Sequence, residues 1–272
     1  MSGIIFQAKT QEGSIIKSLV ELLQNNIKDA CFEIDYSGIR LRMMDYHKII
    51  LLDMMLAAEN FSTYRFEKRD KMYLGLSVGI LHKTLKNLKK NDTIEFVIEA
   101  KNPHQIIIKI TPKDTTRVTA STMNVQNIQN VEIELPEIKC RPVIISSGEF
   151  QKMCKTLQGL SPNTQISTKG NIVRFTSDDG VIKRDTYFGQ TDDNTEYTFE
   201  TKDADYTENF SSEQLSRITK FASLSKNMQV CCQVGQPLLL RSSVGSLGKI
   251  GIYLKSTEFQ EAEARSVEPE SE

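Results

Sequence analysis

Apolar residues recur at helical spacing in two stretches of the chain that begin about 134 residues apart. The first stretch follows Gly13-Ser14 and the second follows Ser147-Gly148. In both, apolar positions return every three or four residues, which is the spacing of one buried helix face. The pattern predicts two amphipathic helices, with apolar faces formed by Ile15, Ile16, Leu19, Val20, Leu22 and Leu23 and by Phe150, Met153, Cys154 and Leu157.

Each predicted helix is followed by two segments of strand-like sequence, joined by a turn that contains glycine. Cys31–Ile34 leads into Ser37–Leu41, and Gln165–Ser167 leads into Gly170–Phe175. A further helix and strand follow in each half, at Leu81–Lys86 and Thr93–Ile98 and at Leu215–Lys220 and Met228–Val234. This internal duplication predicts an α+β chain of two similar domains.

The chain length agrees with a duplication, because 272 residues suffice for two small domains of about 130 residues each. We expect domains at residues 1–121 and 139–257, joined by a linker at 122–138 that is rich in Asn and Gln. The linker carries a small apolar cluster at Ile133, Leu135 and Pro136. This cluster either pins the linker to a sheet or rims a groove, and the sequence leaves both alternatives open.

The formal net charge of −1 conceals an uneven distribution along the chain. Residues 258–272 hold six glutamates and one arginine, a local charge of −5, and subtracting it from the total leaves +4 on residues 1–257. A short segment so rich in one charge is typical of disorder. We therefore expect an acidic, disordered tail after a mildly basic folded body.

Residue types that support catalysis or metal binding are scattered along the chain. The five cysteines show no CxxC spacing, and the three histidines form no HExxH motif or other ligand cluster. The nearest approach to a phosphate loop, Gly245–Ile250, has the wrong spacing and predicts a hairpin turn. We expect no catalytic residue, no metal and no cofactor, which favours a binding or scaffolding protein over an enzyme.

The N-terminal residues do not resemble a signal peptide, since no basic segment precedes an apolar stretch. No run approaches the ~18 apolar residues of a membrane-spanning helix. An odd number of cysteines favours a reducing compartment. We expect a soluble intracellular protein.

Basic residues pair at i, i+3 spacing on three of the four predicted helices. A single such pair is typical of a solvated helix face, but the recurrence at equivalent places in both halves favours one polyanionic partner. No aromatic residues interleave with these positions, so contact with a duplex backbone is favoured over stacking of single-stranded bases. The pairs are Lys83 with Lys86, Lys152 with Lys155, and Arg217 with Lys220.

Several short fragments along the chain share one resemblance. They lie at Phe6–Lys9, Gly13–Lys17, Asp29–Phe32, Ser37–Ile39, Met44-Asp45, Phe61–Arg65, Leu135–Glu137, Ser147–Phe150, Thr219-Lys220, Pro237-Leu238 and Gly251–Lys255. In their order and spacing the chain resembles the eukaryotic-type DNA sliding clamps, the proliferating cell nuclear antigen family, over most of residues 5–257. A divergent or viral member would fit.

The resemblance implies the DNA-clamp fold, with two similar domains that each pack two helices on antiparallel sheets. It implies a homotrimeric ring of six domains whose helices line a central hole around double-stranded DNA, without sequence preference. The family's channel-facing basic positions fall on Lys17, Lys83, Lys86, Lys152, Lys155 and Lys220. Arg217 joins this set from its spacing alone.

The resemblance also implies a subunit interface formed by edge strands at about Arg117–Met123 and Ile182–Phe188. Such strands would pair between neighbouring subunits and extend a sheet across each junction. The residues expected there are Arg117, Thr119, Ser121, Met123, Ile182, Arg184, Thr186 and Phe188.

Partners of the family dock a short peptide with apolar and aromatic anchors beneath the interdomain linker. The matching positions are Met44, Lys48, Ile49, Leu51, Ile133, Leu135, Pro136, Pro237, Tyr253, Lys255 and Ser256. The family usually has Ala-Pro after the last leucine, whereas Lys255-Ser256 stands here. Lys255 is therefore expected to favour peptides with acidic residues.

The function expected from these observations is that of a non-enzymatic DNA polymerase processivity factor for replication and repair. It would tether polymerase, clamp loader and other proteins that carry clamp-binding peptides, in the nucleus if cellular or at the site of viral DNA replication if viral, with no membrane contact. The alternative is a subunit of a heteromeric checkpoint-type or specialised clamp. A nucleic-acid-modifying enzyme is a third hypothesis.

Overall fold

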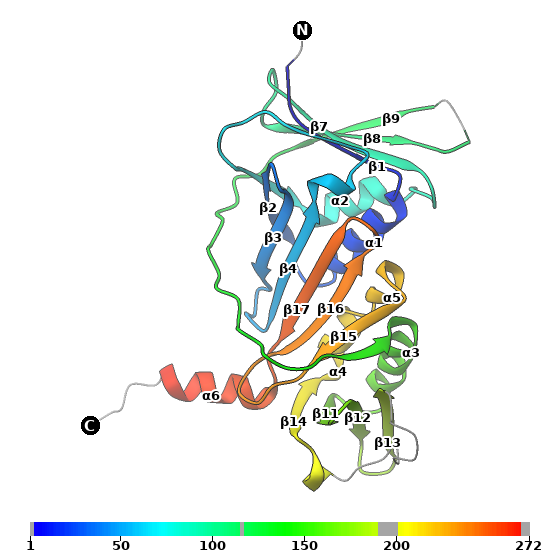
Figure 1. Ribbon diagram of the computed structural model, residues 1–272, viewed down its shortest axis with the longest axis vertical. Coiled ribbons are helices and arrows are strands. Elements are labelled where there is room, and N and C mark those ends of the chain that lie inside the picture. The colour runs from blue at the N-terminus through cyan, green and yellow to red at the C-terminus, as the bar shows by residue number, and fades with distance from the viewer. Residues whose placement is uncertain (1–2, 115–116, 190–200, 268–272) are drawn as a thin grey trace. The chain divides into compact units, whose positions relative to one another are not determined.

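The computed structural model describes residues 3–114, 117–189 and 201–267 (Figure 1). The chain divides into two compact units. The first comprises Met1–Tyr46, Leu52–Ile133 and Ser243–Ile250, and the second comprises His47–Leu51, Glu134–Ser242 and Gly251–Glu272. The units thus differ from the expected linear boundaries, because β4 (Ile50–Ala57), β16 (Leu238–Val244) and β17 (Gly248–Leu254) each contribute residues to both.

The first unit combines a five-stranded antiparallel sheet, in the order β5-β1-β7-β8-β9, with a second group of strands in which β2 pairs with β3 and β6. Helices α1 and α2 pack against each other, and α2 contacts β2 and β6. The elements are β1 (Ile4–Thr10), α1 (Gly13–Gln24), β2 (Asp29–Asp35), β3 (Gly38–Met44), η1 (Ala58–Asn60), β5 (Thr63–Phe66), β6 (Met72–Ser77), α2 (Val78–Leu85), β7 (Thr93–Glu99), β8 (Gln105–Thr111) and β9 (Thr119–Asn124).

The second unit repeats this plan with a four-stranded sheet, in the order β13-β12-β11-β14, and a second group in which β15 pairs with β10 and β16. Helix α3 packs against α4 and α5 and contacts β10 and β15. The elements are β10 (Val143–Ser146), α3 (Ser147–Gln158), β11 (Asn163–Lys169), β12 (Ile172–Asp178), β13 (Lys183–Gly189), η2 (Thr201–Asp203), β14 (Tyr206–Ser211), α4 (Ser212–Arg217), α5 (Phe221–Leu224), β15 (Asn227–Cys231) and α6 (Thr257–Val267).

The predicted apolar helix faces form the cores of the two units. On α1, the residues Ile16, Leu19 and Leu23 are buried and line, with strand residues of both groups, a small apolar gap of about 60 Å³. On α3, Phe150 is fully buried and packs edge-to-face on Phe175 of β12, with ring centroids 6.0 Å apart. The two similar α+β domains predicted from the repeat are thereby confirmed.

Local sequence also fixes where the helices of the second unit begin. The hydroxyl oxygens of Ser146 and Ser211 accept hydrogen bonds from the backbone N–H of Glu149 and Gln214, three residues later. This serine N-cap satisfies backbone donors that a helix leaves unpaired in its first turn. The fourth predicted helix is split, since α4 ends at Arg217 and Lys220 stands at the N-cap of α5.

Two expectations about the chain between and after the domains need correction. Strand β9 extends through Asn124, so the irregular linker begins later than residue 122. The expected disorder of the acidic tail is wrong for its first part, because residues 257–267 form helix α6. Residues 268–272 lie outside the described part of the chain. Glu258 and Glu263 of this helix find partners at Asn209 and Lys255 of the second unit, contacts that composition does not reveal.

The five cysteines are free in this structure. Burial raises the pKa of the Cys154 thiol to about 12, and burial together with the neighbouring Cys140 raises that of the Cys231 thiol to about 12. Both thiols therefore stay protonated and unreactive near neutral pH. Among the described residues, no helix is long and apolar enough to cross a membrane.

The β2–β3 turn depends on Gly38, which has a φ of 144°. A Cβ atom at this position would lie 2.0 Å from the carbonyl oxygen of Leu56. We predict that Gly38→Ala lowers the free energy of unfolding by about 1–3 kcal/mol or more, since it combines backbone strain with a backbone clash. Thermal unfolding followed by circular dichroism measures the effect.

Gly79→Ala is the matched control. Gly79 lies on α2, and a Cβ atom there meets nothing within 4 Å. This substitution should be neutral or stabilise the protein by about 0.5–1 kcal/mol through helix propensity. Equal melting temperatures for the two variants would contradict the role assigned to Gly38.

Candidate nucleic-acid and partner-binding sites

In the first unit the expected DNA-facing residues lie on α1 and at the end of α2. Lys83 and Lys86 are exposed, whereas Lys17 is half-buried. The Lys17 ammonium donates a hydrogen bond of 2.7 Å to the carbonyl oxygen of Lys86, at the end of α2, where helix carbonyls lack helical partners. Lys17 thus fastens α1 to α2, and Lys83 and Lys86 are the more available charges.

In the second unit two of the four expected basic residues stand beside acidic residues of their own helices. Lys152 and Lys155 are exposed on α3, and the Lys152 ammonium lies 2.8 Å from the Glu149 carboxylate. On α4, the Arg217 guanidinium lies 2.5 Å from the carboxylate of Glu213. Exposed pairs of this kind contribute only about 0–1 kcal/mol, so a phosphate could take the place of either carboxylate.

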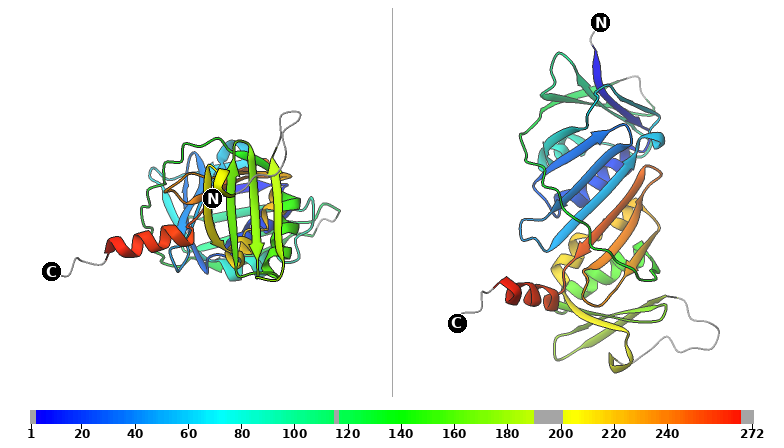
Figure 2. Two further views of the ribbon diagram at one scale, coloured as in Figure 1. Left: turned by 90° about the horizontal axis from the view of Figure 1, so that it is seen from below. Right: turned by 60° about the vertical axis from the view of Figure 1, so that its left-hand side comes forward.

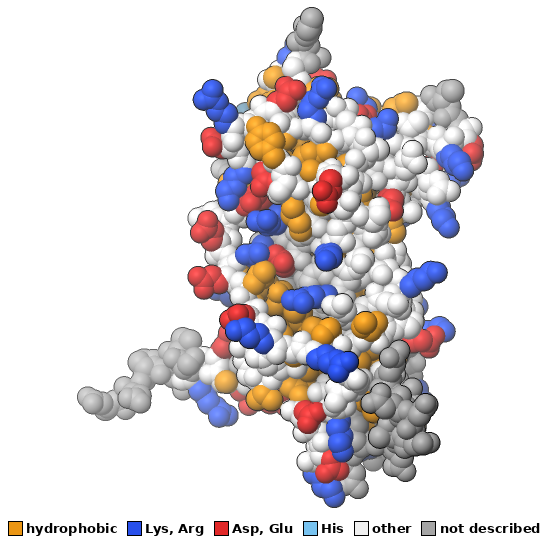
Figure 3. Space-filling model, viewed as in Figure 1, with side chains coloured by type: hydrophobic (Ala, Val, Ile, Leu, Met, Phe, Trp, Pro, Cys, Tyr) orange, Lys and Arg blue, Asp and Glu red, His pale blue; other side chains and the backbone are white. Residues whose placement is uncertain are grey.

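One face of the molecule is mixed in charge. On the face of the molecule drawn in Figure 3, basic and acidic side chains are interspersed, with apolar side chains between them. A polyanion binds best to a surface that carries mainly positive charge. The face drawn in Figure 3 carries charges of both signs.

The expected interface strands lie at sheet edges. Strand β9 stands at one end of the five-stranded sheet and pairs with β8, and β13 stands at one end of the four-stranded sheet and pairs with β12. Arg117 and Ile182 lie just before these strands. The expected residues within them are Thr119, Ser121 and Met123 on β9 and Arg184, Thr186 and Phe188 on β13.

Two of these interface candidates also serve the core of their own unit. Met123 is only 7% exposed. The Phe188 ring packs edge-to-face on Phe175, with centroids 5.8 Å apart. Exposed side chains such as Thr119 and Arg184, and the strand backbones, are better placed to meet another chain.

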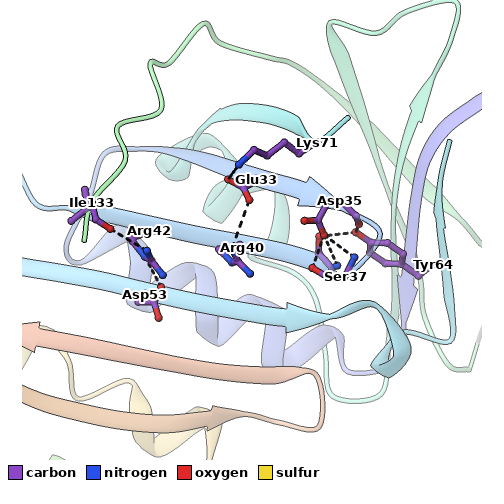
Figure 4. A network of polar contacts seen from close by, with 10 residues as sticks. Glu33, Asp35, Ser37, Arg40, Arg42, Asp53, Tyr64, Lys71 and Ile133 are labelled. Carbon is purple, nitrogen blue, oxygen red and sulfur yellow. Dashed lines mark hydrogen bonds and ion pairs between the residues drawn. The ribbon is translucent and has the colours of Figure 1, made fainter. Parts of the chain in front are cut away.

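A polar anchor in the first unit holds the linker. The Arg42 guanidinium lies 2.9 Å from the Asp53 carboxylate and donates a 3.0 Å hydrogen bond to the carbonyl oxygen of Ile133 (Figure 4). Arg42 and Asp53 come from the adjacent strand segments β3 and β4. The linker is therefore pinned here through its backbone, while the Ile133 side chain is half-buried.

The expected peptide pocket is distributed over both units. Met44, at the end of β3, and Ile133 belong to the first unit, and the other nine positions belong to the second. Within the second unit, the Lys255 backbone N–H donates a 3.1 Å hydrogen bond to the Ile49 carbonyl oxygen. The structure thus brings these two positions together.

The other pocket positions of the second unit differ in exposure. Leu51, Pro237, Tyr253 and Ser256 are buried, Leu135 and Pro136 are half-buried, and Lys48 is exposed with a φ of 57°. Buried positions shape a pocket, and the half-buried linker residues are those that a ligand could cover.

Helix α6 brings residues to this region that sequence reasoning missed. The Glu263 carboxylate lies 2.6 Å from the Lys255 ammonium, and the Glu258 carboxylate accepts hydrogen bonds from the backbone and side chain of Asn209. A signal for the helix was present in the sequence, because Glu, Gln, Ala and Arg, all good helix formers, dominate residues 258–265.

The surroundings of α6 carry an excess of negative charge. Burial raises the pKa of the Glu208 carboxyl on β14, hydrogen bonds with Ser256 and Tyr206 oppose that shift, and the charge of Glu258 raises the pKa further.

No group of three or more His, Cys, Asp or Glu in the described ranges could hold a metal ion.

Comparisons with known proteins cover nearly the whole chain. The family models for the N-terminal and C-terminal domains of proliferating cell nuclear antigen match residues 5–134 and 133–257. A protein of Paramecium bursaria Chlorella virus 1, named probable DNA polymerase sliding clamp 1, is 28% identical over 91% of this chain and 95% of its own.

Cellular relatives are similarly distant. The proliferating cell nuclear antigen of Caenorhabditis elegans is 28% identical over 92% of this chain and 96% of its own. The crystal structure of the Entamoeba histolytica protein covers 93% of this chain and 99% of its own, with a TM-score of 0.80 at 22% identity. With two family models matched in order along both of its halves, this chain belongs to the proliferating cell nuclear antigen family.

Proposed function

We infer that this protein is a DNA polymerase processivity factor, a non-enzymatic sliding clamp that encircles duplex DNA and tethers replication and repair proteins to it. The observation that carries this function is the match of both halves to the two domains of the clamp family. The name of the Chlorella virus relative, a probable DNA polymerase sliding clamp, agrees with it. The working site is the nucleus of a cellular source or the replication site of a viral one.

The proposed assembly is a homotrimer closed by sheet pairing. Strand β9 of one subunit would pair with β13 of the next, a head-to-tail contact that closes into a ring of three. Both strands stand at sheet edges, which supports this pairing. Six repeats of the helix layer would then face the DNA.

The proposed mechanism needs only weak contacts with DNA. A closed ring stays on the duplex because of topology, and sequence-blind contacts between basic residues and phosphates break and reform as it moves. The ring keeps a bound polymerase near the primer end, so rebinding becomes an effectively intramolecular event. The polymerase would attach through a short peptide that inserts apolar and aromatic anchors beside Leu135 and Pro136.

The ring hypothesis is tested by loading the protein with a clamp loader and ATP onto a nicked circular duplex. We predict that the loaded protein survives a wash in high salt, because topology rather than charge retains it, and that it is released when the circle is cut. Gel filtration of the DNA measures the retained fraction.

The assembly is checked separately by light scattering, where the trimer should have three times the 30.9 kDa mass of the chain. Release by salt from the intact circle, or a stable monomer at micromolar concentration, would contradict the closed homotrimer. A monomer that enters a ring only with a different chain would instead support the heteromeric alternative.

The DNA-facing assignment predicts the salt dependence of binding. Lys83→Ala with Lys86→Ala should weaken binding to a short duplex and reduce the slope of log affinity against log salt by about 2, because about one counterion is released per phosphate contact. Fluorescence anisotropy at several salt concentrations measures both quantities.

Lys68→Ala with Lys101→Ala is the matched control, because it removes the same charge at exposed positions outside the helices. This control should keep the original slope. Identical slopes for the two double variants would mean that DNA does not contact the end of α2.

The pocket assignment predicts the effect of a charge at Leu135. Leu135→Asp should reduce stimulation of a peptide-bearing DNA polymerase at least tenfold, because an aspartate would have to be desolvated beneath the apolar anchors of the peptide. Primer extension on a loaded template measures the stimulation, and the melting temperature shows whether the fold persists.

Val131→Asp serves as the control, because Val131 lies in the same linker and is 61% exposed. Its stimulation should be close to that of the unaltered protein. Full stimulation by a folded Leu135→Asp variant would refute the pocket.

A further inference from the structure

Helix α6 is an addition to the part of the chain that the family models match. The C-terminal model ends at residue 257, where α6 begins. Figures 1 and 2 show the helix starting beside strand β14, which it contacts, and running away from that strand toward the C-terminus. The helix follows directly on Lys255 and Ser256, two positions of the proposed peptide pocket.

The first of these contacts uses Ser256 to start the helix. Ser256 is fully buried, and its hydroxyl oxygen accepts a 3.0 Å hydrogen bond from the backbone N–H of Phe259. Its carbonyl oxygen accepts another from the N–H of Gln260 at 3.1 Å. The hydroxyl and carbonyl oxygens of Ser256 thus both accept hydrogen bonds from the first turn of α6, while the hydroxyl also bonds the Glu208 carboxyl of β14.

The second contact uses the charge of Lys255. Its ammonium lies 2.6 Å from the Glu263 carboxylate and 5.8 Å from the centroid of the Phe259 ring. The Lys255 side chain is only 16% exposed. The positive charge that stands where the family usually has Ala-Pro is thus held by an acidic residue and an aromatic ring one helical turn apart.

The third contact covers the edge of a sheet. Strand β14 is an edge strand of the four-stranded sheet. The Glu258 carboxylate accepts a 2.9 Å hydrogen bond from the backbone N–H of Asn209 and a 2.6 Å hydrogen bond from the side-chain amide nitrogen of Asn209. Charged acceptors make stronger hydrogen bonds than neutral ones. Glu258 therefore supplies the acceptor that an added peptide would offer to this edge.

We propose that α6 caps the Lys255 end of the peptide pocket, and that partner peptides displace it there by bringing their own carboxylate to Lys255 and their own aromatic ring over its ammonium in place of Phe259. This proposal rests on the pocket assigned above. The partner class that fits is an acidic peptide with aromatic anchors, because those are the groups that α6 itself presents. A peptide without acidic residues would have to leave Lys255 paired with Glu263.

The docked helix is held loosely enough to be displaced. Most of its named contacts are polar, and of the apolar side chains at residues 257–265, Phe259 and Ala262 line the groove beside Glu208 and Gly235. Burial raises the pKa of the Glu208 carboxyl, and the nearby negative charge of Glu258 raises it further, so the two carboxylates repel each other. If α6 is docked about nine-tenths of the time, it weakens the apparent affinity of a competing peptide about tenfold.

The test compares two substitutions on the same helix of the full chain. Glu263→Ala removes the carboxylate that holds Lys255, and Glu261→Ala removes an equal charge whose acidic group pairs within α6, 3.7 Å from Arg265. The probe is a fluorescein-labelled peptide with paired aromatic anchors and two flanking aspartates. A second probe has asparagine in place of both aspartates.

We expect Glu263→Ala to bind the acidic probe about three- to tenfold more tightly than the unaltered chain, and Glu261→Ala to bind it equally. Glu258→Ala should act in the same direction as Glu263→Ala. The asparagine probe should bind the unaltered chain more weakly than the acidic probe does. Equal affinities of Glu263→Ala and Glu261→Ala for the acidic probe would overturn the proposal.

The Leu135→Asp variant separates this failure from failure of the pocket. If Leu135→Asp abolishes binding of the probe while Glu263→Ala and Glu261→Ala bind it equally, the pocket assignment is supported and the role of α6 is wrong. If Leu135→Asp binds the probe as well as the unaltered chain does, the pocket itself is wrong and the proposal falls with it.

Hydrogen exchange gives a readout that does not depend on affinity. The backbone amides of α6 should be protected in the free chain and should exchange faster when the acidic probe saturates the pocket, whereas those of α3 should not change. Unaltered protection of α6 with the probe bound, or no protection in the free chain, would overturn the displacement.

Discussion

The burial of one apolar helix face in each half is the constraint on which the rest of this structure depends. Leu22 and Leu23 on α1 and Phe150 on α3 are wholly removed from solvent. Each such side chain contributes about 1.5–3 kcal/mol when it is buried. Because a helix has one rotational setting once its apolar face is fixed, the same burial decides which residues face outward. The position of Lys155 at the surface of α3 is a consequence of the core.

The surface charges are balanced so that no single contact is strong. Lys17 is committed to the carbonyl groups at the end of α2, while Lys152 and Arg217 each stand beside a carboxylate of their own helix. Pairs of this kind are worth about 0–1 kcal/mol each, far less than a buried leucine. A protein that must slide needs such contacts, because a phosphate that bound several free cations tightly would hold the ring in place.

Local sequence predicted the helices and strands because their signals lie within a few residues of one another. The spacing of Ile16, Leu19 and Leu23 is visible without knowledge of the fold, and so are the glycine turns. The linker anchor was not predictable, because Arg42 and Ile133 are 91 residues apart. Helix α6 was missed for the same reason, since composition indicated disorder and the contact between Glu258 and Asn209 spans 49 residues.

The linker at Ile133 and helix α6, which are proposed to meet partners, are held by different interactions from the helices and sheets that carry them. The scaffold is held by burial, and loosening it would expose many apolar side chains at once. The linker at Ile133 and the helix α6 are held mainly by hydrogen bonds and ion pairs, through Arg42 in one case and through Glu258 and Glu263 in the other. Such contacts exchange for equivalent contacts with a ligand at little net cost, because each group keeps a partner throughout. An incoming peptide with the right charges can therefore rearrange these segments while the buried core remains intact.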